Sequence, residues 1–420
     1  MYRTFFKLIV SILTAGLLAV LCVRSITGAG YQNMGNLNLL WAVEEDSQVQ
    51  EKLERAERYL KQAVFFDPDK LNHSRSLGEV RFFKLDYPEA QSAFLVSSAD
   101  QHLRTFQLAW LFSTGVQVLH QKSYDEAIGV KNIMGRITSI YPEDAVLTCK
   151  SQQVSIGLGQ AWSFGHEGDP KAQEIVYQMV IALAPGCPAA YYDLGNLRSS
   201  QQRYDEAIVA FQQGIAVDLK TTACGYEYIA GAYMEQGRLD EVAEAAEAAI
   251  RHGGGSQATM LLGRVYQLRG DLPHARDQYL TATQQTSPCE HDDWSRWRAF
   301  FYLGWMAFDR TEYDLAISYI MQASSVMPGT AAEPQALKFA GDMYRQRGML
   351  PEAIQIYEQA ARLAPAGWDW VKNIHLALAD AYRDAGQTAS AIQEYSRALQ
   401  RTPNDSYIEA ELSKLQSINK

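Results

Sequence analysis

Residues 334–365, PQALKFAGDMYRQRGMLPEAIQIYEQAARLAP, decide the fold because they predict two amphipathic helices joined by a tight turn. Gly348 tolerates a positive φ at the end of the first helix, and Pro351 suits the first turn of the second, which Pro365 ends. The apolar and small residues fall three and four positions apart, first Leu337, Ala340, Gly341 and Tyr344, then Ala353, Tyr357, Ala360 and Leu363. The stretch is therefore predicted to be a helical hairpin with one apolar face on each helix.

Gly341 and Ala353 are the small residues of these two faces, so the helix backbones can approach closely there. Tyr344 and Tyr357 can fill the space beside the crossing point. A single hairpin of this size cannot bury its apolar face alone. The stretch thus predicts an array of stacked hairpins.

The same spacing recurs along the chain and resembles the tetratricopeptide repeat, a helical hairpin of about 34 residues. Glycine or alanine recurs at positions 195, 230, 263, 304, 341 and 379, which gives six copies in register. The residues expected to pack the helices of each copy are Gly195, Ala207, Ala230, Gly263, Ala275, Gly304, Ala316, Gly341, Ala353, Ala379 and Ala391. The resemblance implies an all-α fold, a right-handed superhelical solenoid.

The sequence divides into four parts. Residues 1–30 form an N-terminal anchor or signal sequence, residues 31–186 a series of divergent repeats, residues 187–405 the regular repeats, and residues 406–420 a polar helix that closes the stack. In the divergent part, Leu77, Gly78, Ala90 and Phe94 keep the spacing of a full repeat, but the intervals are looser. The number of repeats between residues 31 and 186 stays open.

The N-terminal segment predicts a single transmembrane helix. An uncharged run from Leu8 to Val23 lies between Lys7 and Arg24, and residues 5–23 together can span the apolar part of a bilayer. The alternatives are a signal peptide cleaved near residues 27–30 and an apolar first helix packed on the repeats. Arg3 and Lys7 precede the run, so the N-terminus is expected in the cytoplasm and the repeats outside the membrane, or secreted after cleavage.

The composition and motifs do not indicate an enzyme or a nucleic-acid-binding protein. The formal net charge is -10 and the pI is about 5.4, whereas a nucleic-acid groove requires a basic stripe. No phosphate-binding glycine loop and no nucleophile elbow occurs, and we expect no cofactor. Cys289, His291, Asp292 and Asp293 could hold a cation, but a solvated loop without metal is favoured because no second ligand cluster has matching spacing.

The cysteines leave two alternatives open. Cys187 and Cys224 both precede the first helix of consecutive repeats, so they could form a disulfide in an oxidising compartment. Unpaired, half-buried thiols are favoured because neighbouring repeats stack about 10 Å apart.

The resemblance also implies a groove lined by the first helix of each repeat. The residues that would face it are Tyr192, Asn196, Glu227, Arg264, Phe301, Trp305, Phe308, Lys338, Asp342, Arg345, Asp380 and Arg383. Some members of the family hold a peptide carboxylate with a lysine and an asparagine one turn apart, whereas this chain has Asp342 one turn after Lys338. The aromatic residues could contact a partner or only pack between repeats.

These features predict a membrane-tethered scaffold that presents a protein-binding surface to an envelope or membrane complex, and no nucleic acid as partner. One alternative is an accessory subunit of polysaccharide assembly or export, with groove aromatics stacking on sugar rings. Another is a purely structural subunit of a large membrane complex. The identity of the partner, the pathway and the oligomeric state stay open.

Overall fold

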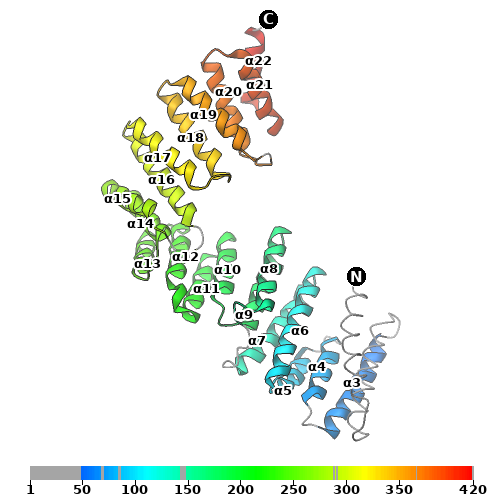
Figure 1. Cartoon of the computed structure of the whole chain (residues 1–420). Coiled ribbons are helices and arrows are strands. Elements are labelled where there is room, and N and C mark those ends of the chain that lie inside the picture. Colours follow the sequence, from blue (N-terminus) through cyan, green and yellow to red (C-terminus); the bar gives the residue numbers. More distant parts are fainter. Residues whose placement is uncertain are drawn as a thin grey trace. The chain divides into compact units, whose positions relative to one another are not determined.

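The computed structural model describes residues 49–67, 71–83, 87–141, 148–286, 289, 292–365 and 367–418. These residues form twenty α-helices and one short 3-10 helix, with no strand among them (Figure 1). The predicted all-α repeat fold is confirmed for this part of the chain.

The chain separates into two compact units, residues 1–218 and residues 219–420. The helices of the first unit are α3 (Val49–Phe66), α4 (Leu71–Phe83), α5 (Tyr87–Ser97), α6 (Gln101–His120), α7 (Tyr124–Ile140), α8 (Gln152–His166), α9 (Pro170–Leu183), α10 (Pro188–Ser200) and α11 (Tyr204–Val217). The helices of the second unit are η2 (Leu219–Thr221), α12 (Thr222–Glu235), α13 (Leu239–Arg251), α14 (Ser256–Leu268), α15 (Leu272–Gln284), α16 (Asp292–Asp309), α17 (Tyr313–Val326), α18 (Ala332–Gln346), α19 (Leu350–Leu363), α20 (Val371–Asp384), α21 (Thr388–Arg401) and α22 (Ser406–Ile418).

The stretch that decides the fold forms the hairpin of α18 and α19. Gly348 lies between the two helices with φ of 81°, a conformation that side chains with a Cβ rarely adopt. At the crossing point, a Cβ on Gly341 would lie 2.5 Å from Cε1 of Tyr357, and Ala353 has no exposed area. The glycine is therefore required because the tyrosine ring of the second helix occupies the space of a side chain.

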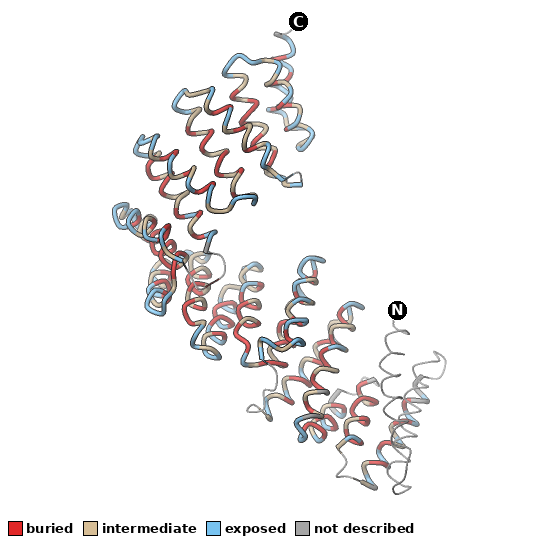
Figure 2. The backbone as a smooth tube through the Cα atoms, viewed as in Figure 1, coloured by how far each residue is buried: buried red, intermediate tan, exposed pale blue. Residues whose placement is uncertain are grey.

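The same contact recurs in the other hairpins. A Cβ at the corresponding glycine of three further repeats would lie 2.3 to 2.8 Å from the ring or side chain on the paired helix: Gly195 on Phe211, Gly263 on Tyr279 and Gly304 on Ile320. The alanines at the predicted crossing positions all have no exposed area, namely Ala207, Ala230, Ala275, Ala316, Ala353, Ala379 and Ala391. Figure 2 shows buried residues along the helix faces that meet within and between hairpins. The small residues thus set the distance between paired helices.

The divergent N-terminal region is also built from helical hairpins. In the part that the structure describes, α4 pairs with α5, α6 with α7, and α8 with α9, while α3 packs against α4. At the other end of the chain, α22 packs against α21 through Ile408, Leu412 and Leu415, and Asp405 accepts hydrogen bonds from the first amides of α22. This terminal helix covers the last repeat.

The cysteines form two disulfides, which corrects both alternatives drawn from the sequence. Cys187 bonds to Cys149 and not to Cys224, with the two Cα atoms 4.9 Å apart. Cys224 bonds to Cys289, with Cα atoms 5.4 Å apart. The stacking distance between helices does not apply here, because Cys149 and Cys289 lie in the segments that precede α8 and α16 and reach back to the N-terminal ends of α10 and α12. Neither disulfide crosses the boundary between the units.

The predicted membrane anchor at residues 5–23 lies outside the described residues. Among the helices that the structure does describe, none combines the length and the apolar character needed to cross a bilayer.

A partly buried ion-pair cluster joins three helical segments of the first unit. Glu174 of α9 accepts hydrogen bonds from Arg198 of α10 at 3.0 Å and from Arg203, before α11, at 2.6 Å. Burial disfavours the charged carboxylate, but the hydrogen bonds from Arg203 and Arg198 outweigh it and hold the pKa of Glu174 below its usual value. The folded state therefore stabilises the ionised form.

We expect Glu174→Gln to lower the free energy of unfolding of the first unit by about 1–2 kcal/mol at neutral pH, because charge-assisted bonds are replaced by weaker ones. A group whose pKa is lower in the folded state than in the unfolded state stabilises the folded protein at pH values above its unfolded pKa. The difference between variant and wild type should therefore shrink as the pH falls through the folded pKa, below 4.5. Urea unfolding of both proteins at neutral and acidic pH measures this difference in the free energy of unfolding. Glu244→Gln, at an exposed position, should have no effect, and an equal effect of both variants would contradict the prediction.

Candidate functional site

Aromatic side chains from three consecutive first helices meet in the second unit. Phe301 lies 4.8 Å from Phe339 between ring centroids, Trp305 lies 5.9 Å from Phe339, and Phe339 lies 6.1 Å from Trp370. Phe308 lies 5.6 Å from Trp305. All five side chains are partly exposed. We call Phe301, Trp305, Phe308, Phe339 and Trp370 the aromatic patch.

The local sequence explains why these rings share one face. Phe301, Trp305 and Phe308 are spaced by four and three residues on α16, so they lie along one side of that helix. Phe339 comes from α18, and Trp370 is the residue directly before α20. Phe301 and Phe308 also pack against the buried core between α16, α17 and α18. The rings therefore pack between repeats and still expose part of their surface.

Further tryptophans extend the patch at its edges. Trp297 stacks on Phe301 with centroids 5.0 Å apart, and Trp294, which is 40% exposed, lies against Trp297. Trp368 lies 5.2 Å from Trp370. Trp297 is buried and its indole Nε1 has no hydrogen-bond partner. The aromatic surface is thus continuous from α16 to the segment before α20.

Lys338 lies beside the patch and is neutralised within the protein. Its ammonium is 5.2 Å from the Phe339 ring centroid and 6.0 Å from that of Trp370, and it pairs with Asp342 at 2.6 Å. The other carboxylate oxygen of Asp342 accepts a hydrogen bond from the Tyr357 hydroxyl at 2.6 Å. A carboxylate ligand would have to compete with Asp342 for this lysine.

The pairing of a groove aspartate with a tyrosine of the second helix repeats one hairpin later. The Tyr395 hydroxyl donates to Asp380 at 2.5 Å, as Tyr357 does to Asp342. Burial, followed by the neighbouring carboxylate, raises the pKa of both tyrosine hydroxyls above their ordinary value. Each aspartate therefore holds a buried tyrosine in place.

The two groove arginines complete an ion-pair network. Arg345 pairs with Asp384 at 2.6 Å and with Asp380 at 3.4 Å. Arg383 pairs with Asp384 at 3.0 Å and with Glu411 at 3.2 Å. Arg345, Asp380 and Arg383, predicted to face a partner, are thus engaged in ion pairs within the last repeats.

Two predicted groove residues lie inside the protein instead. Tyr192 is 7% exposed and its ring fills the space where a Cβ on Gly214 would be. Glu227 is 1% exposed and accepts a hydrogen bond from the Gly255 amide at 3.0 Å. Asn196 is exposed on α10, and Arg264 lies 5.1 Å from the ring centroid of Tyr302.

The possible cation site around Cys289 loses its sulfur ligand to the disulfide with Cys224. Cys289 is also buried, which corrects the expectation of a solvated loop at this residue. His291 lies outside the described residues. No group of three possible ligands is found among the described residues.

Three segments match models described as tetratricopeptide repeat: residues 188–221, 229–288 and 344–415. They fall within the region of regular spacing except for residues 406–415, which belong to the terminal helix. The hairpins of that region have the small-residue contacts described above. These three segments are therefore tetratricopeptide repeats. Repeats of this kind indicate a scaffold for protein–protein interaction.

Several solved structures are similar in fold. A tetratricopeptide repeat protein from Parabacteroides merdae is 15% identical, with 63% of this chain and 100% of that chain covered and a TM-score of 0.38. PilF from Pseudomonas aeruginosa is 15% identical, with 55% and 97% covered and a TM-score of 0.41. A chain of the APC/C hetero-tetramer Cut9–Hcn1 is 13% identical, with 93% and 98% covered and a TM-score of 0.40. No curated protein sequence matches the chain.

Proposed function

We propose that this chain is a membrane-tethered scaffold whose exported repeats dock a protein of an envelope or membrane complex at the aromatic patch. The observation that carries the proposal is the set of partly exposed rings that three consecutive first helices bring together. Large aromatic side chains contribute much of the binding energy at protein interfaces, because they bury a large area and lose little conformational entropy. The neighbouring ion pairs are already satisfied, which favours a partner that binds mainly through apolar side chains.

The location outside the cytoplasm is supported by the two disulfides. Structural disulfides persist in oxidising compartments and are rare in reducing ones. Together with the apolar run at residues 8–23, they favour a body on the outer side of the membrane. Sequencing the N-terminus of the mature protein from a membrane fraction tests this step: an intact Met1 terminus supports the anchor, and a terminus near residue 30 supports a cleaved signal.

Replacing Trp305 and Phe308 together by alanine is expected to weaken capture of the partner about 10- to 100-fold, since two partly exposed rings of the patch are lost. Pull-down from a detergent extract of the native membrane, followed by affinity measurement with the recovered partner, gives the readout. Circular dichroism should show unchanged helicity. Trp162→Ala, at a side chain 65% exposed in the first unit, is the matched control and should bind normally. Unchanged capture by the double variant would remove the patch from the docking site.

The aromatic rings also suit a polysaccharide, because sugar rings stack on aromatic faces. Parallel binding of the purified body to peptide and glycan arrays separates the two ligand classes. Peptide binding that requires Trp305 supports the scaffold, whereas glycan binding with the same requirement supports a role in polysaccharide assembly.

A further inference from the structure

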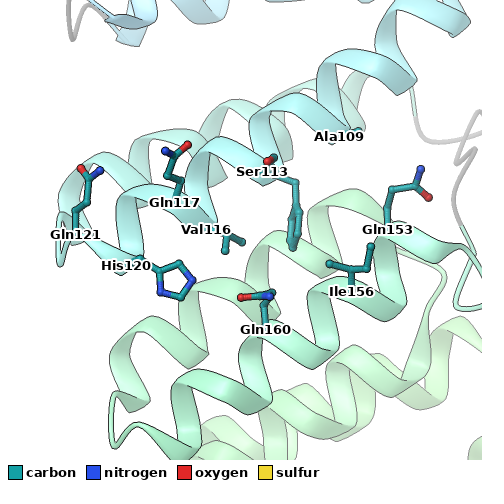
Figure 3. A pocket seen from close by; sticks show the side chains of 10 residues that line it. Ala109, Ser113, Val116, Gln117, His120, Gln121, Gln153, Ile156 and Gln160 are labelled. Carbon is teal, nitrogen blue, oxygen red and sulfur yellow. The ribbon is translucent and has the colours of Figure 1, made fainter. Parts of the chain in front are cut away.

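A cavity of about 850 Å³ lies between α6 and α8 in the first unit (Figure 3). Both are first helices of their hairpins, and each packs chiefly on second helices: α6 on α7 and α9, and α8 on α9. A Cβ on Gly157 would lie 2.9 Å from Cζ of Phe112, so α6 and α8 approach closely at this residue. The volume falls within the range of about 300 to 1,000 Å³ that is usual for ligand sites. The cavity therefore has the size of a site for a small molecule.

One half of the cavity, which we call the apolar half, is lined mainly by apolar side chains. They are Ala109, Phe112 and Val116 of α6 and Ile156 of α8. Ile156 is 51% exposed although it points toward the cavity (Figure 3). Ser113 and Gln153 also line the cavity here, and both are exposed. An alkyl group placed in this half would cover the apolar surface that Ile156 leaves in water.

The other half, which we call the polar half, lies at the C-terminal end of α6. Its lining residues are Gln117, His120 and Gln121 from this end of α6 and Gln160 of α8. Figure 3 shows His120 and Gln121 at one end of the cavity and Ala109 and Gln153 at the opposite end. None of the four polar side chains makes a hydrogen bond within the described part of the protein. Three amides and an imidazole thus offer donors and acceptors to a ligand.

The whole lining contains no carboxylate, lysine or arginine, although 20% of the chain is charged. A charged ligand group placed in the cavity would lose hydration without gaining a fixed partner of opposite charge. A group that carries hydroxyl, ester or amide functions can instead hydrogen-bond to the glutamine side chains. The lining therefore favours an uncharged ligand.

The length of the apolar half limits the alkyl part of such a ligand. Ala109 and Val116 are seven residues apart, which corresponds to about 10 Å along a helix. An extended chain advances about 1.2 Å per bond, as the polypeptide backbone does, so about eight carbons span roughly 8 Å. The apolar half can therefore hold an alkyl chain of medium length.

We propose that this cavity binds an uncharged amphiphile, with a head of hydroxyl, ester or amide groups in the polar half and a medium-length alkyl tail in the apolar half. A peptide carries amide groups along its whole length, and those in the apolar half would be buried without partners. Phe112 is only 5% exposed and offers no ring face on which a sugar could stack. The cavity lies in the first unit and the aromatic patch in the second, so failure of this proposal would leave the proposed function untouched.

A series of monoacylglycerols tests the proposal on the full chain in lipid nanodiscs, with equilibrium dialysis measuring binding above that of empty nanodiscs. We expect saturable binding of monooctanoylglycerol. Shortening the tail to hexanoyl and then to butanoyl should weaken binding about 10-fold at each step, because each step removes two buried methylene groups. At pH 8, where histidine side chains are ordinarily neutral, octanoate should bind about 10-fold more weakly, since the same tail then carries a charged head.

Two pairs of variants place the site on the protein. Ile156→Asp should abolish binding of monooctanoylglycerol with unchanged helicity, whereas Ile140→Asp, at an exposed isoleucine of α7, should bind normally. Gln160→Ala should weaken binding about 3- to 10-fold, whereas Gln152→Ala, at an exposed position of the same helix, should not change it.

The proposal is overturned if monooctanoylglycerol shows no saturable binding above that of empty nanodiscs, if octanoate binds as tightly, if the three tails bind equally, or if Ile156→Asp has no effect. Displacement of bound monooctanoylglycerol by a lower concentration of an uncharged heptapeptide or of maltoheptaose would also overturn it, because the cavity would then prefer a polymer.

Discussion

Replacing Ala353 by arginine is expected to lower the free energy of unfolding of the second unit by several kcal/mol, about 3 to 5. Ala353 has no exposed area and lies in the hairpin where the Tyr357 ring already fills the space beside Gly341. An arginine there must either bury a charge without a partner or separate α18 from α19. Urea unfolding followed by circular dichroism measures the change.

The control for Ala353→Arg is Gln355→Arg, at an exposed position of the same helix. This variant introduces the same charged side chain without burying it. It should therefore unfold at the same urea concentration as the wild type. Coincident unfolding curves for Ala353→Arg and the wild type would show that the two helices do not cross at these residues.

Removing the Cys224–Cys289 disulfide is expected to cost about 4 kcal/mol in the free energy of unfolding. The bond closes a loop of 65 residues, and a loop of this length greatly restricts the unfolded chain. The double variant Cys224→Ala, Cys289→Ala should therefore unfold at lower urea than the oxidised wild type. Alkylation without a reductant should leave Cys149, Cys187, Cys224 and Cys289 unlabelled.

Reduction of the wild type provides the comparison for this variant. With dithiothreitol, the second unit of the wild type should unfold at the same urea concentration as that of the double variant. The urea concentration at which the variant unfolds should not change when dithiothreitol is added. A wild type that alkylates fully at Cys224 before reduction would contradict the pairing.

The repeat architecture could be predicted because its determinants are local. The spacing alone predicts the packing positions Gly341 and Ala353 and the turn at Gly348. The structure places the hairpin of α18 and α19 where the sequence predicts it. The described part of the looser region between residues 49 and 186 is helical as well, and Gly78 keeps the close contact there, since a Cβ on it would lie 2.7 Å from the Phe94 ring.

The site was harder to predict because side-chain partners come from other helices. Glu227 has the register of a groove residue, but the turn before α14 brings the Gly255 amide over it. The aspartates at 342 and 380 are each followed fifteen residues later by a tyrosine, and this recurrence could have shown that their carboxylates are already bonded. The disulfides depend on the paths of segments between repeats, which helix periodicity does not describe.

The cross-links have a mechanical consequence. A stack of hairpins pulled from its two ends would come apart repeat by repeat, because each repeat is held only by its neighbours. A disulfide prevents the loop that it closes from extending under force. The loops are the 38 residues from Cys149 to Cys187 and the 65 residues from Cys224 to Cys289. At about 3.5 Å per stretched residue, they would withhold roughly 130 Å and 230 Å of contour length. The disulfides thus limit the maximum extension of the oxidised chain, whereas the reduced chain could extend over its whole contour length under the same load.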